Sequence, residues 1–341
     1  MESTLKFDPL RGLLIFFVSL LFSALIMQRL LHIAERIGLI DQPDERKIHK
    51  KPKPLVGGIG MIMALSLTSL LFFQLSHMRG FFSGLIILTI IGFLDDFKEI
   101  SHYWRFLAQA VAVALIILLS NTVLYSFGDL ISTGDISLGI FAIPLTFFCA
   151  IGVINSINMI DGLDGLAGGL SLISFISFAI LSYVNHQFDL MYLSLSLIGV
   201  VSGFLFYNWP PSKLFMGDAG SLSLGFSLAF LSIAITQTKD SNVPPVAPLL
   251  ILAVPIVDTV IVMIQRIIKG NSPFVADKTH IHHRLITASN SKKKALYIIL
   301  AISFLLNLIA VGGTILRIPE YYLFTVFVLY LLVTLSVRLG K

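Results

Sequence analysis

Eleven long apolar runs follow one another along this chain of 341 residues, and they constrain its fold more than any other feature. A helix needs about 20 mostly apolar residues to cross the hydrocarbon core of a bilayer. Hydrophobic residues make up 56% of the chain and charged residues only 13%, whereas soluble domains carry about 25% charged residues. No soluble fold of this size could bury so much apolar surface. The sequence therefore predicts an all-α, polytopic integral membrane protein and excludes a disordered chain, a coiled coil and an ordinary soluble enzyme.

The runs predict about eleven transmembrane helices in one membrane domain that covers residues 1–341. The third run is the weakest, because its uninterrupted apolar core extends only from Phe81 to Leu94. The first run lacks an obvious small-residue cleavage site and is interpreted as a retained helix. Cys149 is the only cysteine, which excludes an intrachain disulfide and a cysteine zinc site. The expected spans cover residues 12–34, 55–75, 80–96, 104–120, 138–157, 166–184, 190–207, 219–236, 246–267, 296–316 and 320–338.

The distribution of Lys and Arg predicts the orientation of these spans. Cytoplasmic loops of membrane proteins carry an excess of Lys and Arg. The loops after the odd-numbered spans, together with the C-terminal tail, hold 18 of the 24 basic residues. We therefore expect the N-terminus outside and the C-terminus in the cytoplasm.

Five polar stretches interrupt the apolar pattern, and this topology places all of them on the cytoplasmic side. Chemistry confined to one interface is typical of an enzyme that takes a soluble substrate, since transporters usually place polar sites near the bilayer midplane. The outer loops are short or bland, with Asp129 and Asp135 as their most notable residues. The five stretches are Asp41–Lys53, Asp95–Asp96, Asn155–Asp164, Asn208–Ser221 and Asp277–Arg284.

Carboxylates dominate three of these stretches. Asp95 and Asp96 end the third span, where adjacent carboxylates repel one another unless they share a cation or a proton. Asp161 and Asp164 are three residues apart among glycines, and Asp218 is expected just before a helix N-terminus, which favours anions. Solvated helix ends and a capping aspartate are the bland alternatives. The functional interpretation is a site for a hard cation such as Mg²⁺ together with phosphate.

Basic residues dominate the other two stretches. The cluster His280-Ile-His282-His283 suits hydrogen bonding to phosphate and sugar groups, or contact with anionic lipid. Zinc is disfavoured there because no cysteine is near and the companion motifs are oxygen donors. Lys50 and Lys51 lie in a proline-flanked run that either anchors the topology or binds a lipid phosphate. Asp258 lies well inside the ninth span and receives no assigned role, because pairing within the bundle explains it equally well.

Together, in this order and on one side of the membrane, these motifs resemble the polyprenyl-phosphate N-acetylhexosamine-1-phosphate transferases of the glycosyltransferase 4, or MraY-WecA-TagO, type. The resemblance covers essentially the whole chain. The segment Ser272-Pro-Phe-x-x-Asp277 resembles the WecA-like branch. Ile281 departs from the three consecutive histidines of MraY, which disfavours UDP-MurNAc-pentapeptide as the donor. The shared signatures are Asp95-Asp96, Asn158-x-x-Asp161-Gly-Leu-Asp164-Gly, Asn208 before Phe215-Met-Gly-Asp218-x-Gly-Ser221, and His280-Ile-His282-His283.

The resemblance implies a Mg²⁺-dependent reaction, with Mn²⁺ as a substitute ion. Undecaprenyl phosphate attacks the β-phosphate of UDP-GlcNAc and gives undecaprenyl-pyrophosphoryl-GlcNAc and UMP. This would be the first membrane step of a cell-envelope glycan pathway, such as lipopolysaccharide or teichoic acid synthesis. It implies the bacterial cytoplasmic (inner) membrane, with the active site built from cytoplasmic loops near residues 35–54, 95–105, 158–165, 208–220 and 268–295.

The resemblance also assigns roles by position. Asp218 matches the principal metal ligand and Asn158 a second one. Asp95 matches the residue that deprotonates or orients the lipid phosphate, and Asp96 would support the metal and phosphate site, so Asp95, Asp96 and Asp218 are the catalytic candidates. Arg105 would meet the pyrophosphate, and either Lys50 or Lys51 would touch the acceptor phosphate. The substrate-binding candidates are Lys50, Lys51, Arg105, Asp161, Asp164, Asn208, Phe215, Arg266, His280, His282 and His283.

Several alternatives stay open at this point. Another UDP-N-acetylhexosamine could be the donor, and a transporter or flippase of polyprenyl-linked sugars is the alternative from another class. No nucleic-acid partner is expected. The sequence leaves open whether the protein is a homodimer, which glycan pathway it serves, and whether transfer takes one step or proceeds through a covalent intermediate.

Overall fold

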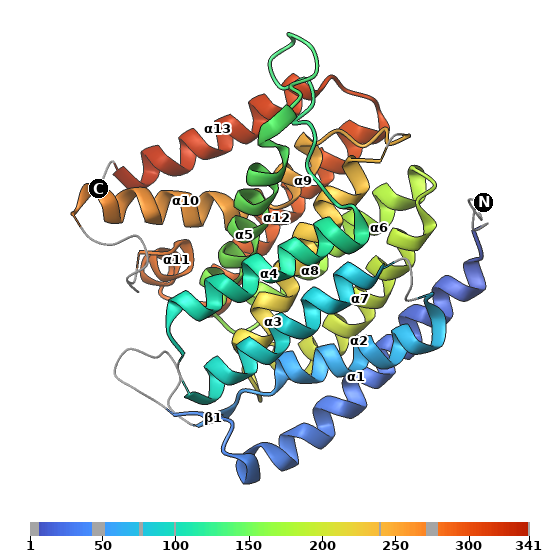
Figure 1. Cartoon of the computed structure of the whole chain (residues 1–341). Coiled ribbons are helices and arrows are strands. Elements are labelled where there is room, and N and C mark those ends of the chain that lie inside the picture. The colour runs from blue at the N-terminus through green and yellow to red at the C-terminus, as the bar shows by residue number, and fades with distance from the viewer. Residues whose placement is uncertain are drawn as a thin grey trace.

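The computed structural model describes residues 7–42, 52–74, 78–98, 100–238, 240–270 and 279–339. Nine of the described helices are long and apolar enough to cross a membrane, which confirms the prediction of an all-α, polytopic membrane protein. They form one bundle, and the N- and C-termini lie at its opposite ends (Figure 1). Lys50 and Lys51 lie outside the described residues.

The first half of the chain forms five of the long helices, one shorter helix and a small hairpin. Strands β1 and β2 pair antiparallel, with Ile40 opposite Pro54, and they are the one sheet of the described residues. A short 3₁₀ turn, η2 (Gly139–Phe141), leads into α5. The elements are α1 (Pro9–Ile37), β1 (Ile40–Asp41), β2 (Lys53–Pro54), α2 (Gly57–Phe72), α3 (Arg79–Lys98), α4 (His102–Ser120), α5 (Ala142–Ile160) and α6 (Leu166–Val184).

The second half adds the other long helices and three short ones. Each expected span is helical, although α2 has only 16 residues and the ninth span is divided between α9 and α10. The third span is not the weakest, since α3 has 20 residues and meets the length and hydropathy of a membrane helix. The elements are α7 (Phe188–Asn208), α8 (Gly217–Thr236), α9 (Val246–Ile251), α10 (Ala253–Ile268), α11 (Ile281–Ser289), α12 (Lys292–Ile315) and α13 (Glu320–Leu339).

The division of the ninth span has a local cause. Proline has no N–H, so Pro255 cannot donate to the carbonyl of Ile251 four residues earlier. Inside a bilayer that carbonyl needs another donor. The side chain of Asn307 in α12 supplies it, with Nδ2 3.0 Å from the Ile251 oxygen. Asn307 in turn accepts the hydroxyl of Ser177 in α6 at 2.7 Å, so the break in one helix ties three elements together.

Helix α8 is the centre of the bundle and packs against α2, α3, α5 and α6. Glycines bring its first turns very close to two neighbours. A Cβ at Gly58 of α2 would lie 2.1 Å from the nitrogen of Gly220, and a Cβ at Gly92 of α3 would lie 2.4 Å from the Cα of Ala219. Small residues allow such backbone contact between membrane helices. The start of α8 is therefore held between the start of α2 and the end of α3.

The end of the bundle away from the start of α8 also carries polar groups. A cavity of about 270 Å³ there is lined by side chains that include Asp135, Gln237 and Glu320. Two of these groups brace the loop after α4 from other elements: Gln237 Oε1 accepts the N–H of Tyr125 at 2.9 Å, and Glu320 Oε2 accepts the N–H of Asp129 at 3.0 Å. Asp135 accepts the hydroxyl of Ser126 within that loop. This side is thus less bland than expected, but these polar groups stabilise the loop.

The close packing around α8 leads to a stability prediction. We expect Gly92→Ala to destabilise the protein by about 1–3 kcal/mol, because the added methyl group has no space against the backbone of Ala219. Gly152→Ala in α5 is the matched control, since a Cβ at Gly152 meets nothing within 4 Å. Thermal unfolding in detergent measures both. Equal melting temperatures for the two variants would contradict the close contact.

Candidate active site

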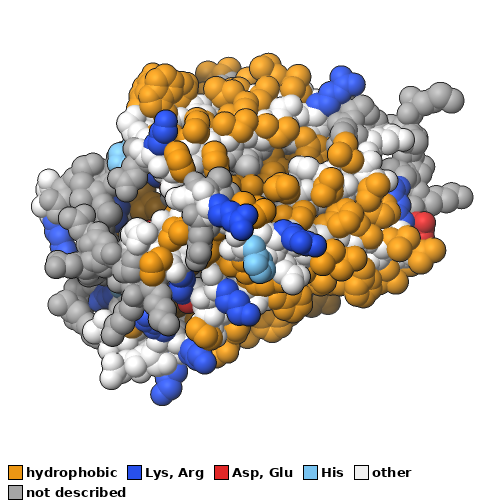
Figure 2. All heavy atoms as spheres, turned by 90° about the horizontal axis from the view of Figure 1, so that it is seen from below, with side chains coloured by type: hydrophobic (Ala, Val, Ile, Leu, Met, Phe, Trp, Pro, Cys, Tyr) orange, Lys and Arg blue, Asp and Glu red, His pale blue; other side chains and the backbone are white. Residues whose placement is uncertain are grey.

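The polar residues of the sequence motifs lie at the end of the bundle where α3, α5 and α7 end and where α4 and α8 begin. The face of the protein seen from below shows many Lys and Arg side chains and little acidic surface (Figure 2). Helix ends leave backbone donors and acceptors unpaired, so this is where the bundle can present polar groups without breaking a helix.

Asp96 caps the N-terminus of α8 from a different helix. Its Oδ1 accepts the N–H of Asp218 at 2.7 Å and its Oδ2 accepts the N–H of Ala219 at 3.2 Å. A carboxylate satisfies the free N–H groups and the positive end of the helix dipole. Asp218 was expected just before this helix, but α8 begins at Gly217. Capping is therefore the role of Asp96, and the Asp218 side chain is not needed for it.

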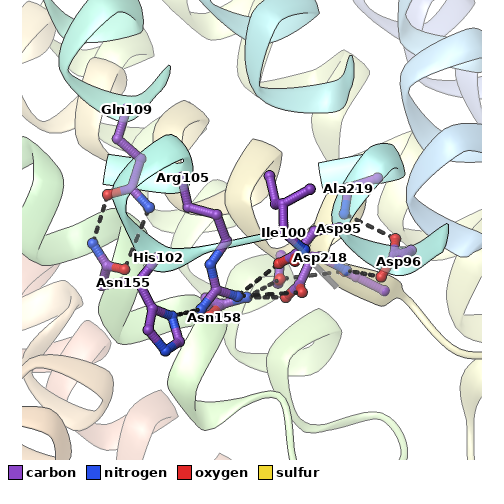
Figure 3. Close-up of polar contacts among 12 residues, drawn as sticks. Asp95, Asp96, Ile100, His102, Arg105, Gln109, Asn155, Asn158, Asp218 and Ala219 are labelled. Carbon is purple, nitrogen blue, oxygen red and sulfur yellow. Dashed lines mark hydrogen bonds and ion pairs between the residues drawn. The ribbon is translucent and has the colours of Figure 1, made fainter. Parts of the chain in front are cut away.

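Arg105 joins two carboxylates beside this cap (Figure 3). Its Nη1 donates to Asp95 Oδ2 at 2.7 Å and lies 3.5 Å from Asp218 Oδ2. Its Nη2 lies 2.5 Å from Nδ1 of His102, one turn earlier in α4. The other oxygen of Asp95 accepts the N–H of Ile100 at 2.8 Å. Both oxygens of the buried Asp95 are thus engaged, and its Oδ2 holds Arg105 beside Asp218.

Asn158 approaches Asp218 from the last turn of α5. Its Nδ2 lies 2.5 Å from Asp218 Oδ1 and 2.8 Å from the hydroxyl of Ser221. One turn earlier in α5, Asn155 exchanges two amide hydrogen bonds with the buried Gln109 of α4, at 2.7 and 3.3 Å. Figure 3 shows this amide pair to one side of the carboxylate cluster, with Arg105 between them. It joins α4 to α5 one turn from both Arg105 and Asn158, and sequence analysis did not identify Gln109.

Lys53 was also missed, although it lies in the basic run where Lys50 and Lys51 were chosen. Its Nζ donates to the hydroxyl of Ser212 at 2.6 Å and lies 3.4 Å from Asp164 Oδ2. The ammonium group also lies 4.6 Å from the centre of the Phe215 ring, as in a cation–π contact. No signal in the sequence identifies it, because Lys53 is brought to the site by a contact of the folded chain, in which the carbonyl of the adjacent Pro54 accepts the N–H of Phe215 at 2.8 Å.

Asn208 holds two loops together instead of facing the solvent. It is buried, its Oδ1 accepts the N–H of Gly165 at 2.8 Å, and its Nδ2 donates to the carbonyl of Leu214 at 3.0 Å. The loop after α5 and the loop before α8 are thereby fixed to each other. A substrate-site role for Asn208 through this backbone is compatible with the geometry.

The histidine cluster lies at the start of α11. His280 is the residue before the helix, and its Nδ1 lies 2.7 Å from Asp258 Oδ2. His282 is buried, and both of its ring nitrogens lack a hydrogen-bond partner among the described residues. A Cβ at Gly162 would lie 2.4 Å from His282 Nε2, so this ring packs on the loop between Asp161 and Asp164. Arg266 is buried in the last turn of α10.

Burial changes the protonation of two groups at this end. Withdrawal from water raises the pKa of Asp161 to about 7, and the negative charges of Asp218 and Asp164 add to the rise. Burial lowers the pKa of His282 to about 3, and the neighbouring His283 adds to the lowering. The site therefore combines a carboxyl group that titrates near neutrality with an imidazole that stays neutral.

The donor set fits a hard cation better than zinc. In the described part of the chain, no three His, Cys, Asp or Glu side chains are placed to share one ion. The carboxylate of Asp218 and the amide of Asn158 do lie together. Mg²⁺ commonly takes one or two protein oxygens and completes its shell with substrate phosphates and water. These two side chains are the ones that would hold it.

Comparison with known proteins gives the family. A model of glycosyl transferase family 4 matches residues 78–236. A Bacillus subtilis protein named probable undecaprenyl-phosphate N-acetylglucosaminyl 1-phosphate transferase is 36% identical over 305 residues, covering 89% of this chain and 85% of the relative. The Haemophilus influenzae undecaprenyl-phosphate alpha-N-acetylglucosaminyl 1-phosphate transferase is 34% identical over 323 residues, covering 93% of this chain and 90% of the relative. An Escherichia coli K12 protein of the same name is 32% identical over 315 residues, or 91% of this chain and 86% of the relative.

The chain belongs to this family of transferases. The resemblance stated from the motifs is thereby confirmed. In this family member, the matched segment 78–236 contains the Asp95–Asp96 pair, the loop after α5 and the start of α8. The clusters around Lys53 and His282 lie outside that segment but inside the longer alignments with the relatives.

The orphaned ring of His282 in this transferase leads to a pH prediction. An unpartnered buried polar group costs about 1–3 kcal/mol, so we expect His282→Leu to melt no lower than the wild type at about pH 7.5. Below the ordinary histidine pKa of 6.5, His282 is protonated in the unfolded wild-type chain. In the folded chain it stays neutral down to its lowered pKa of about 3. The wild type therefore loses stability as the pH falls, by about 1.4 kcal/mol per unit.

The variant lacks this contribution. Thermal unfolding in detergent at about pH 7.5 and about pH 5.5 should show that the advantage of His282→Leu widens on acidification. Melting curves of the two proteins that shift in parallel would contradict a neutral, buried His282.

Proposed function

We propose that this protein transfers GlcNAc-1-phosphate from UDP-GlcNAc to undecaprenyl phosphate, giving undecaprenyl-pyrophosphoryl-GlcNAc and UMP. The observation that carries the proposal is the cluster of Asp218, Asn158 and Arg105 at the start of α8. The names of the relatives, which match the chain over most of its length, support the two substrates. A lipid acceptor and a water-soluble donor can meet only at the bilayer interface, where such helix ends lie.

Two anionic phosphates must approach each other in this reaction. Phosphoryl transfer depends mainly on positioning and on neutralising charge. Arg105 supplies a fixed cation at Asp218, because its Nη1 is also held by Asp95 and its Nη2 lies at His102. Lys53 supplies a second cation at the adjoining loop. The acceptor phosphate oxygen would form a bond to the β-phosphorus while the bond from that phosphorus to the bridging oxygen breaks, and UMP leaves with the electron pair.

Mg²⁺ is part of this proposal. Asp218 and Asn158 would hold it, and when bound it supplies a positive charge that stabilises the diphosphate oxygens. Asp96 orients Asp218 by fixing its backbone N–H. Asp161 lies after the last turn of α5, three residues beyond Asn158, and contributes a further carboxyl group whose charge depends on pH near neutrality.

The proposal places the protein in the bacterial cytoplasmic membrane with this end of the bundle in the cytoplasm. The basic residues on the same end support that orientation, since cytoplasmic loops are rich in Lys and Arg. The N- and C-termini at opposite ends fit an odd number of crossings. A cytoplasmic site is also where a nucleotide sugar is available.

The activity has a direct test. Purified protein with undecaprenyl phosphate and Mg²⁺ should produce lipid-linked sugar and UMP from radiolabelled UDP-GlcNAc. In competition at equal concentration, UDP-GlcNAc should be preferred over UDP-MurNAc-pentapeptide and other UDP-N-acetylhexosamines. Movement of a lipid-linked sugar across vesicles without UMP release would favour a flippase instead.

Asp218 gives the sharpest prediction for the reaction. Because Asp96 caps α8, Asp218→Asn should leave the fold intact while it removes the anionic oxygen that a hard cation prefers. We expect turnover to fall on the order of a hundredfold, with an unchanged melting temperature. Asp240→Asn, an exposed carboxylate at the opposite end, is the matched control. Near-wild-type turnover of Asp218→Asn at limiting Mg²⁺ would remove Asp218 from the metal site.

The orientation is tested by cysteine labelling in a Cys149→Ser background. A cysteine introduced as Ala288→Cys, exposed on α11, should react with a membrane-impermeant maleimide only after right-side-out vesicles are opened. Asp240→Cys, exposed at the other end, should react in intact vesicles. The opposite pattern would reverse the topology.

A further inference from the structure

Asp258 of α10 is buried and accepts three donors. Its Oδ1 accepts the N–H of Ile281 at 2.8 Å and forms an ion pair with Nη2 of Arg338, and its Oδ2 lies 2.7 Å from Nδ1 of His280. The exposed fractions of the Asp258 and Arg338 residues are 1% and 6%. Arg338 belongs to the last turn of α13, and in the sequence analysis it was only one of the basic residues counted for the orientation.

The charge on Arg338 keeps the Asp258 side chain ionised, so that it acts as a hydrogen-bond acceptor. A buried carboxylate is tolerated when a cation and hydrogen bonds compensate it. With Arg338 paired to it, Asp258 stays an anion and acts only as an acceptor. The proton on the contacting nitrogen of His280 is therefore Nδ1–H, and the ring is held in one orientation. Without Arg338 the carboxylate would be uncompensated, and this arrangement would not be stable.

The carboxylate pins the start of α11. His280 is the residue before that helix and Ile281 its first residue, so both contacts with Asp258 fall on the same turn. Arg284 in the next turn lies 3.5 Å from the carbonyl oxygen of Arg338. The end of α13 therefore contacts α10 through Asp258 and α11 through Arg284, although α13 is otherwise at the periphery of the bundle.

From this turn the contacts continue to the loop that contains Asp161 and Asp164. The buried ring of His282 stacks at 5.8 Å from the ring of His280 and contacts Gly162. Gly162 follows Asp161 and precedes Asp164, the two carboxylates of the loop after α5. The unpartnered nitrogens of His282 are placed on that loop by a helix whose first turn Asp258 fixes.

We propose that Asp258 and Arg338 are positioning residues for the nucleotide-sugar donor. They act through His280 by setting α11, and with it His282 and His283, against the loop that contains Asp161 and Asp164. This inference rests on the proposed function, because the donor is the one named there. A merely structural ion pair would instead affect stability and leave the balance between KM and kcat unchanged.

The test compares four variants in the transfer assay. Arg338→Gln should raise the KM for UDP-GlcNAc by about tenfold, with a much smaller change in kcat and an unchanged KM for undecaprenyl phosphate. Asp258→Asn should raise the same KM, because it keeps an acceptor oxygen but loses the charge. Arg338→Lys should lie between, since it restores the charge without the two-pronged guanidinium. Lys293→Gln removes an exposed cation in the first turn of α12 and should leave all three constants at wild-type values.

A second measurement does not need turnover. The rise in melting temperature caused by UDP should be smaller in Arg338→Gln than in the wild type and should recover in Arg338→Lys. If the wild type transfers nothing from UDP-GlcNAc, the proposed function fails, and this UDP-dependent shift alone decides the role of the pair.

Three results would overturn the inference. One is a wild-type KM and UDP shift in both Arg338→Gln and Asp258→Asn. Another is a fall in kcat with KM unchanged. The last is loss of folded protein in all three site variants while Lys293→Gln folds, which would make the pair purely structural.

Discussion

The capping of α8 by Asp96 is the interaction on which the site depends. Helix α8 lies at the centre of the bundle and begins where the polar groups gather, so its first N–H groups need an acceptor that no residue of its own supplies. Asp96 provides that acceptor from α3. The close approach that makes this possible requires glycine at position 92, one turn before Asp96. The side chain of Asp218 is thereby left to face Asn158 and Arg105.

The three carboxylates at the start of α8 differ in how firmly the protein itself engages them. Asp96 is committed to helix N–H groups, and Asp95 to Arg105 and the N–H of Ile100. Asp218 lies against the amide of Asn158, the carboxyl group of Asp95 and, at 3.5 Å, the guanidinium of Arg105. Of the three, it is the carboxylate that could exchange its present contacts for a cation and phosphate with the least disturbance of the fold.

The apolar runs were enough to predict an all-α membrane bundle, and the order of the motifs was enough to predict the family. The sequence could not predict which role each of several similar side chains has in the site. Asp96 and Asp218 differ because of a contact between α3 and α8. Lys53 reaches Ser212 and Asp164 because the folded chain brings Pro54 beside Phe215. Pro255 could have indicated the break in the ninth span. The hydrogen bond from Asn307 to the free carbonyl of Ile251, however, depends on the packing of α12.

Asp258 illustrates the same limit from the other direction. Its position well inside the ninth span suggested either a function or a partner within the bundle, because an ionised group within a bilayer is costly unless it is paired. Its partner, Arg338, lies 80 positions away in the chain and looks like any basic residue near a membrane end. The role of the pair can be inferred only from the contact of His280 with the same carboxylate. Through that contact the buried ion pair fixes the first turn of α11, which leads into the histidine cluster. A peripheral helix such as α13 would thus contribute to the proposed nucleotide-sugar site through one buried contact at its end.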